Sequence, residues 1–319
     1  MKLKRFFLGL LFVLTVICLI TADGAFGQET QFLFKWGSVG SEDGQFCPNY
    51  AEGIAIDSMG NVYVTDNTNN RVQKFTADGT FVTKWGTSGS GNGEFISPVG
   101  IAIDQSGNIY VTDWYNNRIQ KFTADGTYLG QWGSYGSEDG QFYDPRGLAV
   151  DSSGNVYVTD HLNHRVQKFT ADGAYLGQWG THGQGDGQFD RINGIAIDGA
   201  DNIYICDHYN HRVQKFTTNG TFITKWGSFG SEAGQLYFPL GIAVDSSSNV
   251  YVVDQYNHRV QKFTSDGAYL DQWGSLGSED GQFFYPTGVA VNNSGNIYVV
   301  DGWNSRVQVF GSCIGPSTI

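Results

Sequence analysis

The stretch GLAVDSSGNVYVTDHLNHRVQKFTADGAYLGQWG, residues 147–180, decides the fold because similar copies of it recur along the chain. Its leading segment, Gly-x-Ala-x-Asp or Gly-x-Ala-x-Asn, occurs six times at a constant spacing of 47 residues, beginning at Gly53, Gly100, Gly147, Gly194, Gly241 and Gly288. A fixed period of this size indicates a repeat architecture such as a propeller.

Each unit is expected to contain four short strands. In the quoted copy these are residues 147–151, 155–160, 165–169 and 174–180, and the turns between them contain Ser-Gly-Asn and Asp-Gly. Such turn residues tolerate the positive φ angles of tight hairpins, and the β-branched and aromatic residues favour a pleated sheet. Six units of four antiparallel strands predict an all-β protein, a six-bladed β-propeller.

The two ends of the repeat array are predicted to close the ring. Residues 31–37, QFLFKWG, copy the fourth strand of a unit, whereas the last unit stops at a third strand, residues 306–310. The N-terminal strand, residues 31–37, should therefore complete the sixth blade and leave no open edge between blades one and six.

The repeated pattern resembles the NHL repeat over residues 30–311, through its Asp-x-x-Asn-x-Arg turn and its Trp-Gly and Gly-Gln-Phe segments. This resemblance implies a six-bladed propeller used mostly for binding. Ubiquitin-ligase relatives carry a RING domain before the propeller, but this sequence has no Cys/His spacing for zinc, so that activity is not expected. Some relatives bind RNA through a basic face.

Residues 1–28 do not follow the repeat pattern. Lys2, Lys4 and Arg5 precede an apolar run at residues 6–20, and Ala25 and Gly27 are the small residues that a signal peptidase reads. We predict a secretory signal peptide that leaves a propeller of residues 29–319, secreted or at the cell surface. An uncleaved membrane anchor is the alternative.

The charge of the chain bears on its partners. The formal net charge is −12, and loss of residues 1–28 makes it −14 because that segment holds three basic residues and one acidic residue. Such an acidic protein repels nucleic acid, so no nucleic-acid partner is expected. A membrane would be contacted only through an uncleaved N-terminal segment.

Differences between the six copies point to a candidate binding face. Strand directions place the Trp-Gly to Pro loop and the Asp-x-x-Asn-x-Arg turn on one face, and these segments vary most. The candidates are Trp114, Tyr115, Arg146, His161, Asn193, His208, Tyr209, Gln255, Tyr256 and Trp303. Aromatic and polar side chains that the scaffold does not require are typical of a binding face. The expected partner is an extracellular protein, peptide or glycan.

Histidines cluster on the same face. His161, His164, His182, His208, His211 and His258 all fall in blades three to five. Three imidazoles would suit zinc or copper, and the candidate ligands are His161, His182 and His208. However, these turns are expected partway out along the blades, away from the axis. No cofactor is therefore expected, and a transition metal or calcium is the alternative.

The segment DHYNHR, residues 207–212, is predicted to be a structural turn. Asp207, Asn210 and Arg212 recur in every blade, and the position of His211 is held elsewhere by Asn or Ser. Asp and Asn side chains commonly hold backbone groups in turns. The residues then provide a hydrogen-bonding frame and not a ligand set.

The sequence gives little support for a catalytic function. The mouth of the central channel is expected to be surrounded by Glu52, Val99, Arg146, Asn193, Leu240 and Thr287, which include no histidine. The sequence also has no Gly-x-Ser-x-Gly turn and no phosphate loop. The main hypothesis is a non-catalytic binding scaffold. The alternatives are a metal-dependent lyase or hydrolase, of the amidating-lyase or lactonase type, and a structural envelope component.

Overall fold

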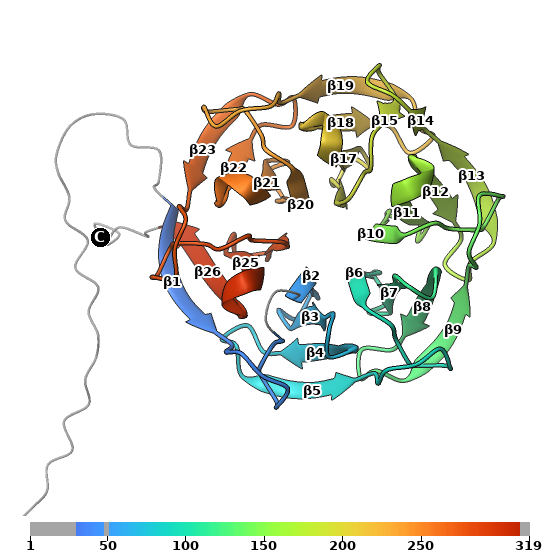
Figure 1. Ribbon diagram of the computed structural model, residues 1–319, viewed down its shortest axis with the longest axis horizontal. Coiled ribbons are helices and arrows are strands. Elements are labelled where there is room, and N and C mark those ends of the chain that lie inside the picture. Colours follow the sequence, from blue (N-terminus) through green and yellow to red (C-terminus); the bar gives the residue numbers. More distant parts are fainter. Residues whose placement is uncertain (1–29, 48–50, 313–319) are drawn as a thin grey trace, which may run out of the picture.

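The structure, a computed structural model, describes residues 30–47 and 51–312. Six four-stranded antiparallel sheets surround a central axis as the blades of a propeller (Figure 1). The predicted all-β, six-bladed architecture is thus confirmed. The predicted signal peptide lies outside the described residues. Within the described ranges, no helix is long and apolar enough to cross a bilayer.

The strands follow the 47-residue period. Blade one comprises β2 (Ala51–Ile56), β3 (Val62–Asp66), β4 (Arg71–Phe75) and β5 (Phe81–Trp85), and blade two β6 (Pro98–Ile103), β7 (Ile109–Asp113), β8 (Arg118–Phe122) and β9 (Tyr128–Trp132). Blade three comprises β10 (Pro145–Val150), β11 (Val156–Asp160), β12 (Arg165–Phe169) and β13 (Tyr175–Trp179), and blade four β16 (Ile195–Ile197), β17 (Ile203–Asp207), β18 (Arg212–Phe216) and β19 (Phe222–Trp226). Blade five comprises β20 (Pro239–Val244), β21 (Val250–Asp254), β22 (Arg259–Phe263) and β23 (Tyr269–Trp273), and blade six β24 (Val289–Val291), β25 (Ile297–Asp301), β26 (Arg306–Ser312) and β1 (Thr30–Trp36).

Short elements occupy the loops of one face. A two-stranded parallel pair is formed by β14 (Thr181–His182) and β15 (Gln188–Phe189). Four turns between second and third strands form 3-10 helices, namely η1 (His161–Asn163), η2 (His208–Asn210), η3 (Gln255–Asn257) and η4 (Gly302–Asn304).

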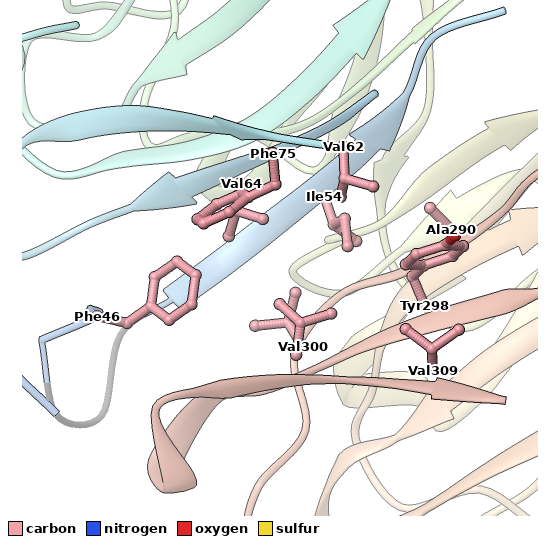
Figure 2. Close-up of a cluster of buried hydrophobic side chains, with 10 residues drawn as sticks. Phe46, Ile54, Val62, Val64, Phe75, Ala290, Tyr298, Val300 and Val309 are labelled. Atoms are coloured by element: carbon pink, nitrogen blue, oxygen red, sulfur yellow. The ribbon is translucent and has the colours of Figure 1, made fainter. Parts of the chain in front are cut away.

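The N-terminal strand closes the ring, as the sequence predicts. β1 pairs antiparallel with β26, and Figure 1 shows the blue first strand beside the red last strand. A buried apolar cluster lies between blades one and six, with Val62 and Val64 on one side and Tyr298 and Val300 on the other (Figure 2). Hydrogen bonds and apolar packing therefore both seal the closure.

Burial changes from the inner to the outer strands. All five residues are buried in each second strand, for example in β11, because each sheet is covered on both faces by neighbouring blades. The fourth strands, such as β9, alternate between half-buried and exposed residues, since successive side chains of a strand point to opposite faces. The outer wall of the propeller is thus the solvated side.

The tryptophans of the Trp-Gly segments pack between neighbouring blades. The ring of Trp85 lies 6.2 Å from Tyr63 in its own blade and 6.0 Å from Phe122 in the next, between ring centroids. Gly126, in a turn of that next blade, has φ +88° and would place a Cβ atom 2.6 Å from the Trp85 ring. Glycine is needed there both for the backbone and for the approach of the ring.

Replacing Gly126 by alanine should destabilise the fold more than the same change at Gly107. Gly107 has φ +82° but nothing within 4 Å of its hypothetical Cβ, so G107A tests the backbone effect alone. We expect a loss of about 1 kcal/mol for G107A and about 3 kcal/mol for G126A in urea unfolding, because G126A also overpacks the Trp85 contact. Equal losses would show that the tryptophan contact adds nothing.

Candidate functional site

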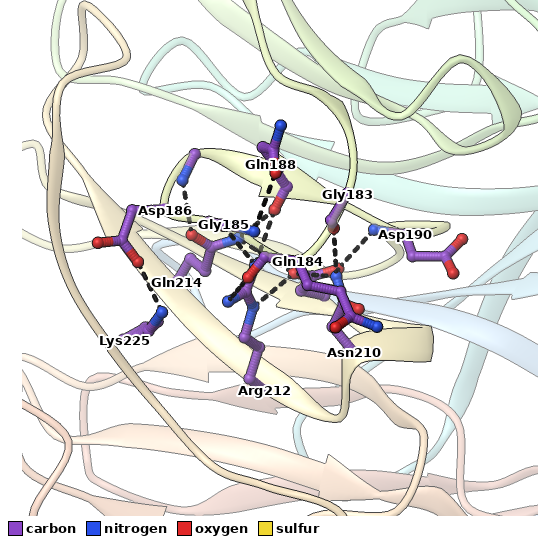
Figure 3. A network of polar contacts seen from close by, with 12 residues as sticks. Gly183, Gln184, Gly185, Asp186, Gln188, Asp190, Asn210, Arg212, Gln214 and Lys225 are labelled. Carbon is purple, nitrogen blue, oxygen red and sulfur yellow. Dashed lines mark hydrogen bonds and ion pairs between the residues drawn. The ribbon is translucent and has the colours of Figure 1, made fainter.

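A buried carboxylate organises each Asp-x-x-Asn-x-Arg turn. The Asp207 carboxylate accepts hydrogen bonds from Arg212 Nε at 2.7 Å, Asn210 Nδ2 at 3.0 Å, Gln214 Nε2 at 3.0 Å and the main-chain N–H of Asp190 at 2.8 Å. The Arg212 guanidinium also donates to carbonyls of the preceding loop (Figure 3). The predicted hydrogen-bonding frame is confirmed.

Three of the six histidines belong to this frame. His164, His211 and His258 adopt φ near +54°, and Nδ1 of each accepts a main-chain N–H from the next blade at 3.1 to 3.2 Å. In blades one and two the same bond is accepted by Oδ1 of Asn70 and Asn117. An imidazole whose Nδ1 accepts carries its proton on Nε2. These histidines therefore replace asparagine as structural residues.

His161 and His208 use the opposite tautomer. Their Nδ1 atoms lie 2.9 and 3.0 Å from the carbonyl oxygens of Ile192 and Pro239 in the next blade. A carbonyl oxygen only accepts, so Nδ1 carries the proton and Nε2 keeps a lone pair. Burial lowers the pKa of His161 to about 2 and that of His208 to about 4. Both rings are neutral near pH 7.

These two histidines line a central hollow of about 480 Å³ on the variable face. Its lining comprises Glu52, Asp144, Arg146, His161, Leu162, Arg191, Asn193, His208, Tyr209, Leu240, Gln255, Thr287 and Trp303. The hollow lies over the mouth of a narrow channel that is lined by the predicted set, Glu52, Val99, Arg146, Asn193, Leu240 and Thr287. Most of the candidate binding-face residues thus meet at one place.

The expectation that these turns lie away from the axis is wrong for the first residue of the turn. His208 is hydrogen-bonded to Pro239, the first residue of the innermost strand β20, and His161 to Ile192, just before Asn193. Each ring therefore reaches across to the inner edge of the neighbouring blade. The channel lining itself contains no histidine, as predicted, but the hollow above it contains two.

One half of the rim is charged and rigid. Arg146 donates to both carboxylate oxygens of Asp144, at 2.6 and 3.1 Å, and its guanidinium lies 4.1 Å from the centroid of Trp114, which stacks on Tyr115. Burial alone would lower the pKa of Arg146, but Asp144 and Glu52 outweigh it and raise that pKa. Burial raises the pKa of Glu52, and Arg146 partly opposes the shift.

The other half of the rim is an aromatic arc, defined as Tyr209, Phe238, Tyr256, Tyr285 and Trp303. Consecutive rings lie 4.9 to 5.1 Å apart between centroids. The first and last members line the hollow. Tyr209, Tyr256 and Trp303 are each more than two-fifths exposed. The arc is therefore a continuous series of ring contacts, in which three rings are exposed and the other two are half-buried.

Two members of the aromatic arc are held in a costly backbone conformation. Phe238 and Tyr285 have φ +54° and +48°, where bulky residues are rare. The equivalent residues of other blades are Ser97, Asp144 and Arg191, so the turn itself does not require an aromatic ring. Comparison of the six sequence copies identified Tyr209, Tyr256 and Trp303. It missed four residues that occupy one equivalent position in blades three to six, although that position varies between the copies: Asp144, Arg191, Phe238 and Tyr285.

The predicted metal candidates are not gathered together. Within the described part of the chain, His182 lies beside His164 and Asp190, whose potential ligand atoms are all within 4.8 Å of one another. His164 Nδ1, 3.7 Å from Asp190, already accepts the N–H of Arg191, and His182 is exposed. His161 and His208 line the hollow instead.

Family models match most of the repeat array. A model described as a six-bladed β-propeller, DUF5128, matches residues 54–133, and the NHL repeat model matches residues 142–169, 189–216, 236–263 and 283–310. Protein lin-41 of Caenorhabditis elegans is 43% identical over 51 residues, which are 16% of this chain and 4% of that protein. That similarity concerns a small part of either protein.

Solved structures share the fold at low sequence identity. A virginiamycin B lyase from Staphylococcus aureus is 15% identical over 91% of this chain and 86% of that chain, with a TM-score of 0.59. A gluconolactonase from Xanthomonas campestris is 16% identical over 83% and 87%, with a TM-score of 0.64. A chain of the nidogen/laminin complex is 20% identical over 76% and 82%, with a TM-score of 0.56. Enzymes and binding proteins thus share this architecture.

Protonation of His161 and His208 should destabilise the protein in acid. Their folded pKa values lie below the ordinary value, so the unfolded chain takes up protons first as the pH falls. The stability that they contribute is complete above about pH 6.5 and declines below it, down to about pH 4 for His208.

The double variant H161N/H208Q should therefore lose less stability than the unchanged protein between about pH 7.5 and 4.5. Asn67 and Gln255 occupy the equivalent positions, so the substitutions suit the turn. We expect the two proteins to differ in this loss by at least about 2 kcal/mol in urea unfolding. Buried carboxylates titrate in both proteins and cancel in the difference. If the stability of the two proteins changed with pH in parallel, the lowered pKa values of His161 and His208 would be contradicted.

Proposed function

Because this chain is a six-bladed propeller built from NHL repeats, we propose that it works as a non-catalytic binding module. The ligand would be an extracellular protein, peptide or glycan, held on the face that carries the central hollow and the aromatic arc. The proposal rests mainly on the aromatic arc, because the repeat fold does not require aromatic side chains at these positions. Secretion through residues 1–28 is part of this proposal.

The energetic cost of the aromatic arc supports a binding role. A bulky residue in the left-handed region costs of order 1–3 kcal/mol, and Phe238 and Tyr285 both adopt it. Their partners in the arc expose large apolar surfaces that folding does not bury. A ligand that covers one such side chain gains about 1.5–3 kcal/mol. Contiguous exposed aromatic surface is typical of interaction sites.

The charges on this face favour a ligand other than nucleic acid. Arg146 is paired with Asp144, and Arg191 stacks on Tyr209 with its guanidinium carbon 4.7 Å from the ring centroid. Residues 29–319 contain no run of basic residues, and their formal net charge is −14. Nucleic-acid binding depends on unpaired basic groups that contact phosphates.

Replacing Trp303 or Tyr256 by alanine should weaken ligand binding at least about 10-fold each, because each ring supplies on the order of 1.4 kcal/mol or more at a desolvated contact. The measurement is retention of extracellular material by immobilised protein of residues 29–319. Tyr135, 64% exposed but outside the aromatic arc, provides the matched control Y135A. Undiminished retention by W303A and Y256A would exclude the aromatic arc as the binding site, and retention of no ligand by the unchanged protein would favour a purely structural envelope role.

A metal-dependent lyase or hydrolase is the second candidate. The observation in its favour is that His161 and His208 line the same hollow as Glu52, with Nε2 unprotonated. Metal-ligating histidines commonly donate their other N–H to a carbonyl, as these two do. A carboxylate and two imidazoles are a donor set that zinc accepts, although among the described residues only His164, His182 and Asp190 bring three potential ligand atoms within 4.8 Å of one another.

Elemental mass spectrometry of the tag-free protein separates the two candidates. For a binding module we expect no stoichiometric transition metal after zinc is supplied and the excess is removed. A near-stoichiometric metal that H161A/H208A loses, while H182A retains it, would favour the metal-dependent enzyme over the binding module. H182A is the control because His182 lies outside the hollow lining.

A further inference from the structure

We infer that the ligand of this face is a neutral saccharide, with a terminal sugar in the central hollow and the following sugars on the aromatic arc. The inference rests on the proposed binding function and specifies its ligand. It follows from the charge balance, the hydrogen-bonding groups and the shape of the hollow.

The charged residues of the hollow are balanced in number, two arginines against two acids, and Arg146 is already paired. Arg146 holds both oxygens of Asp144, and Glu52 lines the hollow beside it. Arg191 is exposed, and its Nη1 donates to the Tyr209 hydroxyl at 3.1 Å. At Arg146, an anionic ligand would have to displace Asp144, at the cost of leaving a buried carboxylate unpaired. A neutral ligand meets no such cost.

The polar groups of the hollow both donate and accept hydrogen bonds. Nε2 of His161 and His208 can only accept in the tautomer that their carbonyl partners impose. The amides of Asn193 and Gln255 line the same hollow and can do both. Sugar hydroxyl groups also donate and accept, and they match this mixture. An apolar ligand would leave these groups desolvated and unpaired.

The arrangement of polar and apolar groups argues against a protein partner. Protein interfaces place apolar hot spots at the centre and polar groups at the rim. Here His161, Asn193 and Glu52 line the hollow, whereas the aromatic arc forms part of its edge. A hollow of about 480 Å³ has the size of a small-molecule site and suits one or two sugar rings.

The aromatic arc borders the hollow from one lining residue to another. Tyr209 and Trp303 belong to the lining, and Phe238, Tyr256 and Tyr285 connect them through ring contacts of 4.9 to 5.1 Å. Sugar rings present C–H faces that pack on aromatic rings. A glycan chain leaving the hollow would therefore continue on the arc.

The test is a glycan array of neutral and acidic oligosaccharides, probed with residues 29–319 and followed by calorimetric titration of the best neutral hit at several chain lengths. We expect neutral glycans to bind, and affinity to increase with each sugar until the aromatic arc is covered. W303A should lose at least 10-fold in affinity for long oligosaccharides. Q255A should weaken even the shortest, and Y135A should bind as the unchanged protein does.

A photoreactive amino acid in place of Trp303 distinguishes failure of the saccharide inference from failure of the proposed binding function. If no neutral glycan binds but an extracellular protein is cross-linked at this position, the saccharide inference is overturned and the binding function stands. If neither glycan nor protein is captured, both are overturned. Binding of acidic glycans alone would refute the neutral ligand. Neutral-glycan binding that W303A and Q255A leave unchanged would refute this site. Thermal melting of each variant confirms that it is folded.

Discussion

The buried Asp–Arg pair of the repeated turn is the interaction on which the rest of this protein depends. In all six blades the Arg Nε lies 2.7 to 2.8 Å from a carboxylate that is fully buried. Leaving such a carboxylate unpaired would cost several kcal/mol. The guanidinium also binds carbonyls of the preceding loop, as at Arg212 (Figure 3). The pair therefore fixes two loops of each blade at once.

Because the frame fixes the backbone, neighbouring positions are free to vary. The first residue of the turn is His161 or His208 in blades three and four but Gln255 in blade five, and the turn keeps its 3-10 form in all three. The same freedom places Phe238 and Tyr285 where Ser97 suffices in blade two. Stability and the candidate site thus use different side chains of the same loops.

The histidines illustrate how one residue type serves two purposes. His211 uses Nδ1 as an acceptor and so takes the place of an asparagine. His208, three residues earlier, directs Nδ1 to a carbonyl, and its side chain lines the central hollow. The segment DHYNHRVQKF, residues 207–216, is therefore a structural turn that also contributes one side chain to the candidate site.

The sequence alone determined the six blades, the closing strand at residues 31–37 and the role of the Asp-x-x-Asn-x-Arg turn, because each depends on local pattern or exact repetition. The convergence of His161, His208 and Glu52 in one hollow could not be foreseen. Residues 52, 161 and 208 meet only when the blades curve around an axis and a side chain of one blade reaches the inner strand of the next. The period specifies the ring, but the direction of each varying side chain depends on packing between blades.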